Sequence, residues 1–184
     1  EKHQQLDITV VSRGETQRWS ATVFWDKVND YIERYNLETA TLYRNTDAKL
    51  YGIEVDGSRH LSDTLSATAA LSYTRGESDN GDLGQIAPLE ARFNLDYQRD
   101  QWAAGAELVA TTKQDKVNPV IDAGETDGFT VLNFYSSWEP LKSLRLQAGI
   151  ENLLDEMYAY HVNAANSDPF NPDPVRVNEP GRRI

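Results

Sequence analysis

The sequence predicts an all-β protein, an antiparallel up-and-down transmembrane β-barrel, from its alternation, its strand lengths and the order of its connections. Apolar and polar residues alternate along residues 65–74, 91–97, 102–110 and 144–150. A period of two places apolar side chains on one face of a strand and polar side chains on the other. No stretch of similar length shows the period of an amphipathic helix. The alternation therefore predicts strands along most of the chain.

The predicted strands are long. About eight complete strands are expected, at residues 5–13, 17–33, 45–61, 64–75, 89–99, 101–112, 128–139 and 142–153. A strand of a soluble protein has typically five or six residues. A tilted strand that crosses a bilayer needs about nine to eleven. Strand length therefore favours a membrane barrel over a soluble sandwich.

The predicted connections alternate strictly between short and long. The short ones are residues 14–16, 61–63, 99–100 and 139–141, and the long ones are residues 34–44, 76–88, 113–127 and 154–179. This order places all short turns on one rim of a sheet and all long loops on the other. Bacterial outer-membrane barrels have short periplasmic turns and long extracellular loops.

The two faces of the strands differ in a way that suits a barrel in lipid. In a large membrane barrel the apolar face meets lipid and the polar face lines the lumen. Six aromatic residues lie towards the ends of the predicted strands, which suits an interfacial aromatic girdle. They are Trp19, Tyr51, Tyr73, Tyr97, Trp102 and Trp138. Ordinary sheet packing also favours aromatic residues, and a soluble all-β binding module with its apolar face inside is the alternative.

Composition excludes several classes of function. The chain has 184 residues with 29 acidic and 18 basic side chains, a formal charge of −11 and no Cys. An acidic chain lacks the clustered cations that nucleic-acid binding needs, so no nucleic-acid partner is expected. Without Cys there is no disulfide or thiolate metal site. No nucleophile-elbow, zincin or phosphate-loop motif is present, so the chain is not expected to be an enzyme and no resident cofactor is expected.

Four segments, in order, resemble the C-terminal barrel region of TonB-dependent outer-membrane receptors. Residues 149–158, GIENLLDEMY, resemble the family's G-x-x-N-L-hydrophobic-D-x-x-Y, and residues 179–182, EPGR, resemble the Pro-Gly-Arg that opens its last strand. Residues 24–32 and 45–54 resemble two upstream strand motifs. The matching motif residues at the C-terminal end are Gly149, Asn152, Leu153, Asp155, Tyr158, Pro180, Gly181 and Arg182.

The resemblance implies a partial structure. The family has an N-terminal plug domain and a barrel of about twenty-two strands. Residues 1–184 would then be the C-terminal part of the barrel, with about eight long strands and the start of a ninth, and the plug and earlier strands would lie outside the chain. Implied partners are outer-membrane lipid and lipopolysaccharide, the plug, the inner-membrane TonB complex and a metal or metal-chelate ligand. The implied location is the outer membrane of a Gram-negative cell.

Within that family, residues 83–92 and 158–163 resemble segments of copper-type receptors, and related segments occur in siderophore receptors. The transported ligand is therefore expected to be a copper ion or an iron chelate. Met157 and His161 are four residues apart, and their thioether and imidazole are candidate copper ligands. Alternatively, Met157 packs at the rim and His161 lies in a solvated loop. The chain has a single Met, so further ligands would have to come from elsewhere.

Two acidic loops, residues 76–82 and 115–127, are interpreted as solvated and flexible, because their spacing does not fit a calcium loop. Residues 163–180 contain Pro169, Pro172 and Pro174 and are expected to form a stiffened extracellular loop that contacts ligand, gates the pore or shields its mouth.

The strand residues that would face the lumen and hold the plug by hydrogen bonds and ion pairs are predicted to be Arg92, Asp96, Glu107, Arg145 and Glu151. On this interpretation the function is TonB-dependent active uptake of a metal or metal chelate across the outer membrane. A passive porin is the alternative, because it shares the strand pattern but has no plug.

Overall fold

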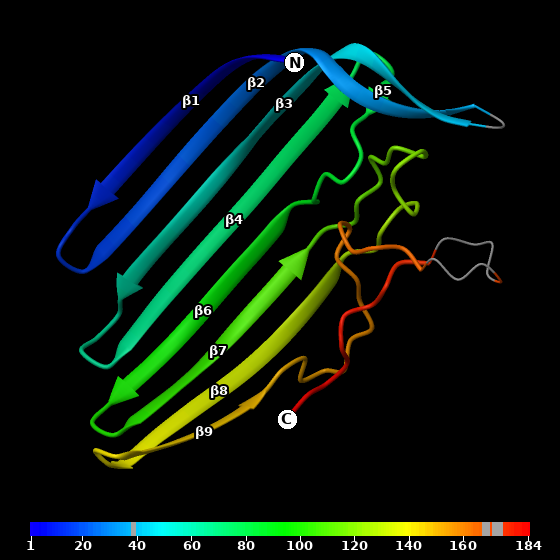
Figure 1. The fold of residues 1–184 in the computed structure, drawn as a ribbon. Helices are drawn as coiled ribbons and strands as arrows, with labels where there is room; N and C mark the ends of the chain where they lie inside the picture. Colours follow the sequence, from blue (N-terminus) through cyan, green and yellow to red (C-terminus); the bar gives the residue numbers. More distant parts are fainter. Residues whose placement is uncertain (38–39, 167–169, 171–174) are drawn as a thin grey trace.

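A computed structural model of the chain describes residues 1–37, 40–166, 170 and 175–184, and in this part it is a single antiparallel sheet without helices (Figure 1). Eight strands lie in chain order and are joined as hairpins or by long loops, and the two-residue β5 pairs with β4 alone. The strands are β1 (Lys2–Arg13), β2 (Gln17–Leu37), β3 (Ala40–His60), β4 (Leu65–Ser78), β5 (Gly81–Asp82), β6 (Glu90–Arg99), β7 (Trp102–Thr111), β8 (Phe129–Leu141) and β9 (Leu144–Ile150).

The sheet is open, with β1 at one edge and β9 at the other. Beyond β9, Glu151 and Arg183 exchange backbone hydrogen bonds of 2.9 and 3.1 Å. The predicted start of a further strand is therefore present as an isolated bridge. In the described part of the chain no helix is long and apolar enough to cross a membrane.

The register sorts side chains onto two faces. Residues that lie opposite each other in an antiparallel pair point to the same face. One cross-strand row runs through Trp19, Gly57, Ala69, Phe93 and Leu108. Successive residues of each strand point to opposite faces, so a polar row lies behind this one. The result is a continuous apolar face and a polar face.

The apolar face is uncovered. Leu6, Ile8 and Val10 on β1 are each more than half exposed, and Phe93 and Leu108 are exposed as well. This arrangement contradicts the alternative of a soluble module that buries its apolar residues at its centre. A monomeric soluble protein rarely leaves an apolar surface of this extent in water.

The six predicted girdle residues lie on the apolar face. Trp102 and Trp138 are opposite each other and stack with ring centroids 5.1 Å apart, next to the turn that joins β6 and β7. Trp19 and Tyr97 also lie near short turns, whereas Tyr51 and Tyr73 lie farther along their strands. Five of the six aromatic side chains are exposed and Tyr51 is half-buried, as a lipid-facing position requires.

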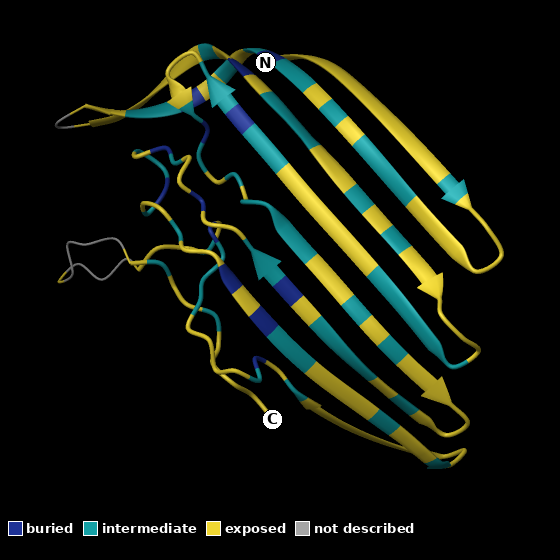
Figure 2. Cartoon of the chain, turned by 180° about the vertical axis from the view of Figure 1, so that it is seen from behind, coloured by how far each residue is buried: buried dark blue, intermediate teal, exposed yellow. Residues whose placement is uncertain are grey.

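The long loops gather at one end of the sheet and the short turns at the other (Figure 1). Buried residues are concentrated at the loop end (Figure 2). They form two small clusters on the polar face, Val28 with Ala48 and Leu83, and Val109 with Phe129 and Val131. The predicted separation of short turns and long loops onto opposite ends is therefore correct, although residues 34–44 are strand rather than loop. The only packed apolar interior in the described residues lies beneath the loops.

Two predicted boundaries are wrong. Residues 34–44, expected as a long loop, continue β2 and β3, which are 21 residues long each. A bulge at Asp30, whose φ is 59°, shifts the register, and buried Glu33 then accepts hydrogen bonds of 2.8 Å from Arg44 and Ser78. This network stabilises the protruding hairpin, which hydrophobic alternation did not reveal. The turn expected at residues 139–141 belongs to β8, which ends at Leu141.

The assignment of faces makes a prediction for charge placement. We expect Leu108→Lys, in the middle of the apolar face, to destabilise the membrane-inserted protein by about 2–4 kcal/mol, because lysine is costly at the bilayer midplane. Asn94→Lys, on the polar face of the neighbouring strand, should cost much less. Urea unfolding of the full-length protein in lipid vesicles measures both. Equal costs for the two variants would contradict the assignment.

Candidate functional site: the polar face and the loops folded over it

The predicted lumen residues share the polar face, and most are already paired there. Arg92 lies 2.7 Å from Glu90 and 3.5 Å from Glu107. Asn133 donates a 3.0 Å hydrogen bond to Glu107, and the Tyr135 hydroxyl donates to Asp96. The sheet therefore presents a fixed pattern of charges on this face rather than a row of independent side chains.

The remaining two predicted lumen residues lie near the β9 edge. Arg145 is 3.4 Å from Glu139, and Glu151 forms an ion pair with Arg183. These pairs are more exposed than the contacts of Glu107. Surface ion pairs of this kind contribute little to the stability of the fold. Their relevance to a function lies in the charges that they place on the polar face. Whether any of the five residues contacts a plug is a prediction that the sheet by itself does not test.

Aromatic residues of the last loop cover the upper part of the polar face. Tyr158 and Tyr160 pack on Phe129, with ring centroids 4.3 and 5.2 Å from it. The Tyr160 hydroxyl accepts a hydrogen bond of 3.4 Å from Arg92. The loop after β9 therefore folds inward, onto the same face as the charged strand residues, instead of projecting away from the sheet.

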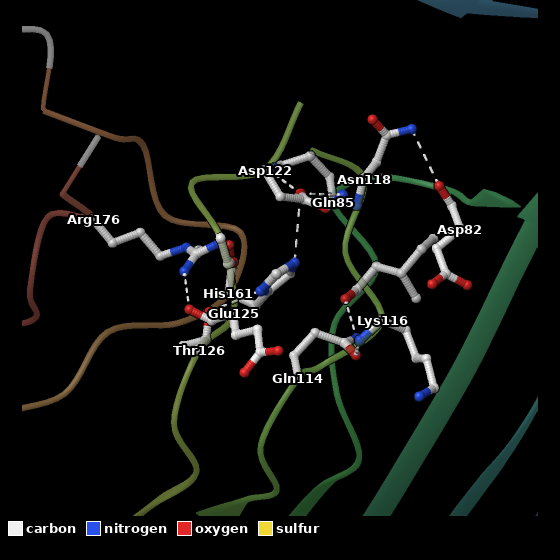
Figure 3. Close-up of polar contacts among 12 residues, drawn as sticks. Asp82, Gln85, Gln114, Lys116, Asn118, Asp122, Glu125, Thr126, His161 and Arg176 are labelled. Atoms are coloured by element: carbon white, nitrogen blue, oxygen red, sulfur yellow. Dashed lines mark hydrogen bonds and ion pairs between the residues drawn. The ribbon is translucent and has the colours of Figure 1, made fainter. Parts of the chain in front are cut away.

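Asp122 is the centre of the loop cluster (Figure 3). Its carboxylate accepts hydrogen bonds from the backbone N–H groups of Asn118, at 2.7 Å, and Gln85, at 2.8 Å. The Asp122 side chain is fully buried. A buried carboxylate is tolerated only where hydrogen bonds or charges compensate its lost hydration, and here the backbone of two loops supplies them.

Asn118 and Gln114 extend the same network to the loop after β5. The Asn118 side chain donates to the carbonyl of Asp82 at 3.1 Å, and Gln114 donates to the carbonyl of Ile86 at 2.7 Å. Gly84 packs so closely against Ile121 that an added Cβ would lie 2.7 Å from the Ile121 Cβ. These contacts correct the expectation that residues 115–127 are solvated and flexible.

The loop at residues 76–82 is also ordered by its charges. Arg75 lies 3.1 Å from Glu77 and 2.5 Å from Asp82, and Lys49 lies 3.0 Å from Glu77. Residues 81–82 pair with β4 as the short strand β5. Glu77 and Asp82 therefore pair with neighbouring cations, whereas Asp79 is exposed. The prediction of a merely solvated segment is wrong for the two paired residues.

His161 joins the last loop to the cluster. Its side chain is fully buried, with Nδ1 2.8 Å from the Thr126 hydroxyl and Nε2 3.5 Å from an Asp122 carboxylate oxygen. Among the described residues, Nε2 has no hydrogen-bond partner. Burial lowers the pKa of His161 below its usual 6.5, and the opposing attraction of Asp122 is smaller. The interpretation of His161 as a solvated residue is therefore wrong.

Arg176, in the C-terminal part of the loop after β9, forms hydrogen bonds to the loop after β7. Its guanidinium donates to three backbone carbonyls, those of His161 at 2.9 Å, Gly124 at 2.8 Å and Glu125 at 3.1 Å. Burial lowers the pKa of Arg176. One side chain thus joins the loop after β7 to the loop after β9. The roles of Asp122, Asn118 and Arg176 were not predicted from the sequence, because each of them also contacts a residue of another loop or strand, 36 to 52 residues away in the chain.

The two C-terminal motif segments meet in space. Asn152 is buried with φ 51°, its side chain bonds the backbone N–H and C=O of Glu156, and its own N–H donates to Asn133. Asn tolerates this left-handed conformation better than most residues. Leu153 follows with a 2.9 Å backbone bond to Leu132. The asparagine therefore turns the chain sharply out of β9 and back onto β8.

The segment after Asn152 also contacts residues 179–182, the second motif segment. Asp155 accepts a 2.8 Å hydrogen bond from the Arg182 N–H, and an added Cβ at Gly181 would lie 2.9 Å from the same carboxylate oxygen. The backbone N–H of Glu179, next to Pro180, donates to the carbonyl of Tyr158 at 2.8 Å. Gly149 lies opposite Tyr135, where there is little space for a side chain.

The structure gives the two candidate metal ligands different surroundings. Met157 is 82% exposed and lines an open cavity of about 430 Å³ with Glu125, Asp127 and Glu156. His161 is buried among hydrogen-bonding partners. Among the described residues no group of three or more His, Cys, Asp or Glu side chains could hold a metal ion. Joint ligation by Met157 and His161 stays a prediction. Pro169, Pro172 and Pro174 lie outside the described residues.

The chain belongs to the family described as TonB-dependent receptor-like, β-barrel, which matches residues 1–153. This agrees with the open all-β sheet and with the motif residues above. Among curated proteins, the Probable hemoglobin and hemoglobin-haptoglobin-binding protein 4 of Haemophilus influenzae is 24% identical in an alignment 153 residues long, which covers 70% of this chain and 15% of that protein.

Solved structures carry the same fold. A structure named Copper transporter OprC is 28% identical, with a TM-score of 0.90, over 98% of this chain and 30% of that one. The FrpB iron transporter from Neisseria meningitidis is 17% identical, with a TM-score of 0.71, over 98% of this chain and 30% of that one, and it shows the fold alone. The chain therefore spans less than a third of the length of each of these proteins.

The loop cluster makes a prediction about local stability. We expect Asp122→Ala to destabilise it by about 1–3 kcal/mol, because the buried N–H groups of Gln85 and Asn118 lose their acceptor. Amide hydrogen exchange of residues 113–127 measures the loss. Asp115→Ala, at an exposed position of the same loop, is the matched control. Equal exchange in the two variants would show that the carboxylate is not the anchor.

A second prediction concerns pH. His161 has a lowered pKa in the folded protein, so the unfolded loop binds more protons than the folded one at mildly acidic pH. Its contribution to stability is complete above about pH 6.5 and is lost as the pH falls toward the folded-state pKa. The hydrogen-exchange protection factors of residues 118–126, which correct for the intrinsic slowing of amide exchange in acid, should therefore fall between pH 7.5 and pH 5.5. His161→Gln, which does not titrate, should flatten this dependence, and an unchanged dependence would refute the assignment.

Proposed function

We propose that this chain is the C-terminal barrel segment of an outer-membrane receptor for TonB-dependent active uptake of a metal or metal chelate, with copper as the favoured ligand. The observation that carries the choice of ligand is the similarity to the Copper transporter OprC, at 28% identity across nearly the whole chain. The plug, the earlier strands and the TonB-binding segment would be supplied by the rest of the protein, in the outer membrane of a Gram-negative cell.

The two faces of the sheet support this function. The apolar face suits contact with hydrocarbon, and in a closed barrel the polar face would line the lumen. Arg92, Asp96 and Glu107 hold their charges in place through ion pairs and hydrogen bonds, so they present a preorganised surface. We propose that this surface contacts the plug, together with Arg145 and Glu151 nearer the β9 edge.

The loop cluster supports a ligand-facing role at the opposite end from the short turns. Asp122, His161 and Arg176 join the loops after β5, β7 and β9 over the polar face. In the proposed barrel these loops form part of the extracellular mouth. Met157, exposed in the open cavity beside Glu125 and Asp127, is the side chain here that is both accessible and a soft ligand for copper.

The proposal is tested by metal uptake in cells that carry or lack the full-length gene. We expect radioactive copper to accumulate faster with the gene than without it, and a protonophore to abolish the difference, because transport through TonB is driven by the inner-membrane proton gradient. A passive porin would give uptake that the protonophore leaves unchanged. Uptake of a ferric siderophore in place of copper would leave the receptor class standing and refute copper.

The same assay tests the role of Met157. Met157→Leu should weaken copper uptake at low copper concentration, because it removes the thioether and keeps a similar volume. Leu154→Ala, an exposed position in the same loop, is the matched control and should behave as the unmodified protein. Equal uptake by Met157→Leu would remove Met157 from the copper path.

A further inference from the structure

The apolar face is hollowed at one place, over β3, β4 and β6. The depression has a volume of about 380 Å³. Gly57 and Ala69 lie opposite each other and form its floor, with Trp19 next to Gly57 and Phe93 next to Ala69 in the same cross-strand row. Because the floor has almost no side chain, a trough two strands wide lies between two aromatic rings.

The lining of the trough fits a hydrocarbon chain. Trp19 is 41% and Phe93 46% exposed, so both rings offer apolar surface that the protein leaves uncovered. Val55 and Leu71 are also part of the lining. Burial of apolar surface of this kind favours an apolar occupant by roughly 25 cal/mol for each Å² removed from water, and nothing in the lining on this face would bind a polar one.

A cation lies at the turn end of the trough. Arg59 is two residues beyond Gly57 on β3, so it points to the same face at about 7 Å along the strand. Its cross-strand neighbours are the neutral residues Gln17 and Ala67. Among the described residues no carboxylate forms an ion pair with the Arg59 guanidinium. An arginine at the edge of an apolar surface extends toward the headgroup region, and its planar donors suit a phosphate.

The position of Arg59 indicates the side of the membrane. It lies near the short turn between β3 and β4, and short turns of outer-membrane barrels are periplasmic. From the midplane toward the periplasmic boundary, the apolar trough comes first and the cation second. A lipid of the inner leaflet has its acyl chain and its phosphate in the same order.

We propose that this trough binds one glycerophospholipid of the inner leaflet of the outer membrane. One acyl chain lies over Gly57 and Ala69 between Trp19 and Phe93, and the phosphate accepts hydrogen bonds from Arg59. The site rests on the outer-membrane location given under the proposed function, but not on the transported ligand. Lipopolysaccharide is not the occupant, because its phosphates belong to the loop end of the barrel, away from Arg59.

The test is lipid binding to the full-length protein in detergent, measured by native mass spectrometry with phosphatidylethanolamine as the probe. Gly57→Leu fills the trough, and the backbone accepts a Cβ there, since the closest atom would be 3.4 Å away. Arg59→Gln removes the charge. Each variant should lower the affinity of the tightest lipid-binding step roughly tenfold. Gly57→Leu removes the contact with the acyl chain, and Arg59→Gln removes the charge-assisted hydrogen bonds to the phosphate.

Arg99→Gln is the matched control, because Arg99 also lies near a short turn at the apolar face but beside the stacked Trp102 and Trp138. It should leave the tightest step unchanged. Unchanged binding in Gly57→Leu and Arg59→Gln, an equal loss in Arg99→Gln, or stronger binding of lipid A at the same step would each overturn the proposal.

A fluorescence measurement keeps the proposal testable if a trough variant does not fold. Phosphatidylethanolamine with brominated acyl chains should quench the tryptophan emission of the unmodified protein more than that of Trp19→Phe. Equal quenching would overturn the proposal. Folded trough variants should retain metal uptake, so a failure of the lipid site and a failure of the proposed transport function remain distinguishable.

Discussion

Antiparallel pairing that continues from β1 to β9 fixes both the shape of the sheet and the direction of its side chains. Within the bilayer an unpaired backbone N–H or C=O costs several kcal/mol, so spanning strands must pair along their whole length. The register of this pairing fixes which side chains share a face, because a slip by one residue would exchange the apolar and polar faces. The apolar face, the charged residues of the polar face and the depression at Gly57 all follow from this pairing.

The open edges at β1 and β9 have a physical consequence. Each edge presents unpaired backbone groups that lipid cannot satisfy, so the sheet is complete only when other strands continue it. The family match and the coverage of about 30% of the solved structures agree with that requirement. The bridge between Glu151 and Arg183 shows how the next pairing begins at the β9 edge.

The loops obey a different rule from the strands. Water surrounds their outer side, but they fold onto the polar face and bury Asp122, Asn118 and His161. Buried polar groups need partners, and backbone N–H groups, a hydroxyl and the Arg176 guanidinium supply most of them. Among the described residues of this cluster, the exception is Nε2 of His161. We therefore expect the stability of the cluster to depend most strongly on the protonation of this ring.

The class of fold, the two faces and the C-terminal motifs could be predicted from the residues alone, because a period of two and a turn such as that at Asn152 are local properties of the chain. The shared face of Arg92, Asp96 and Glu107 could be predicted for the same reason. The length of the β2–β3 hairpin, the burial of His161, and the roles of Asp122 and Arg176 became evident from the folded chain. Those features depend on partners tens of residues away, and hydrophobic periodicity carries no information about which loops meet.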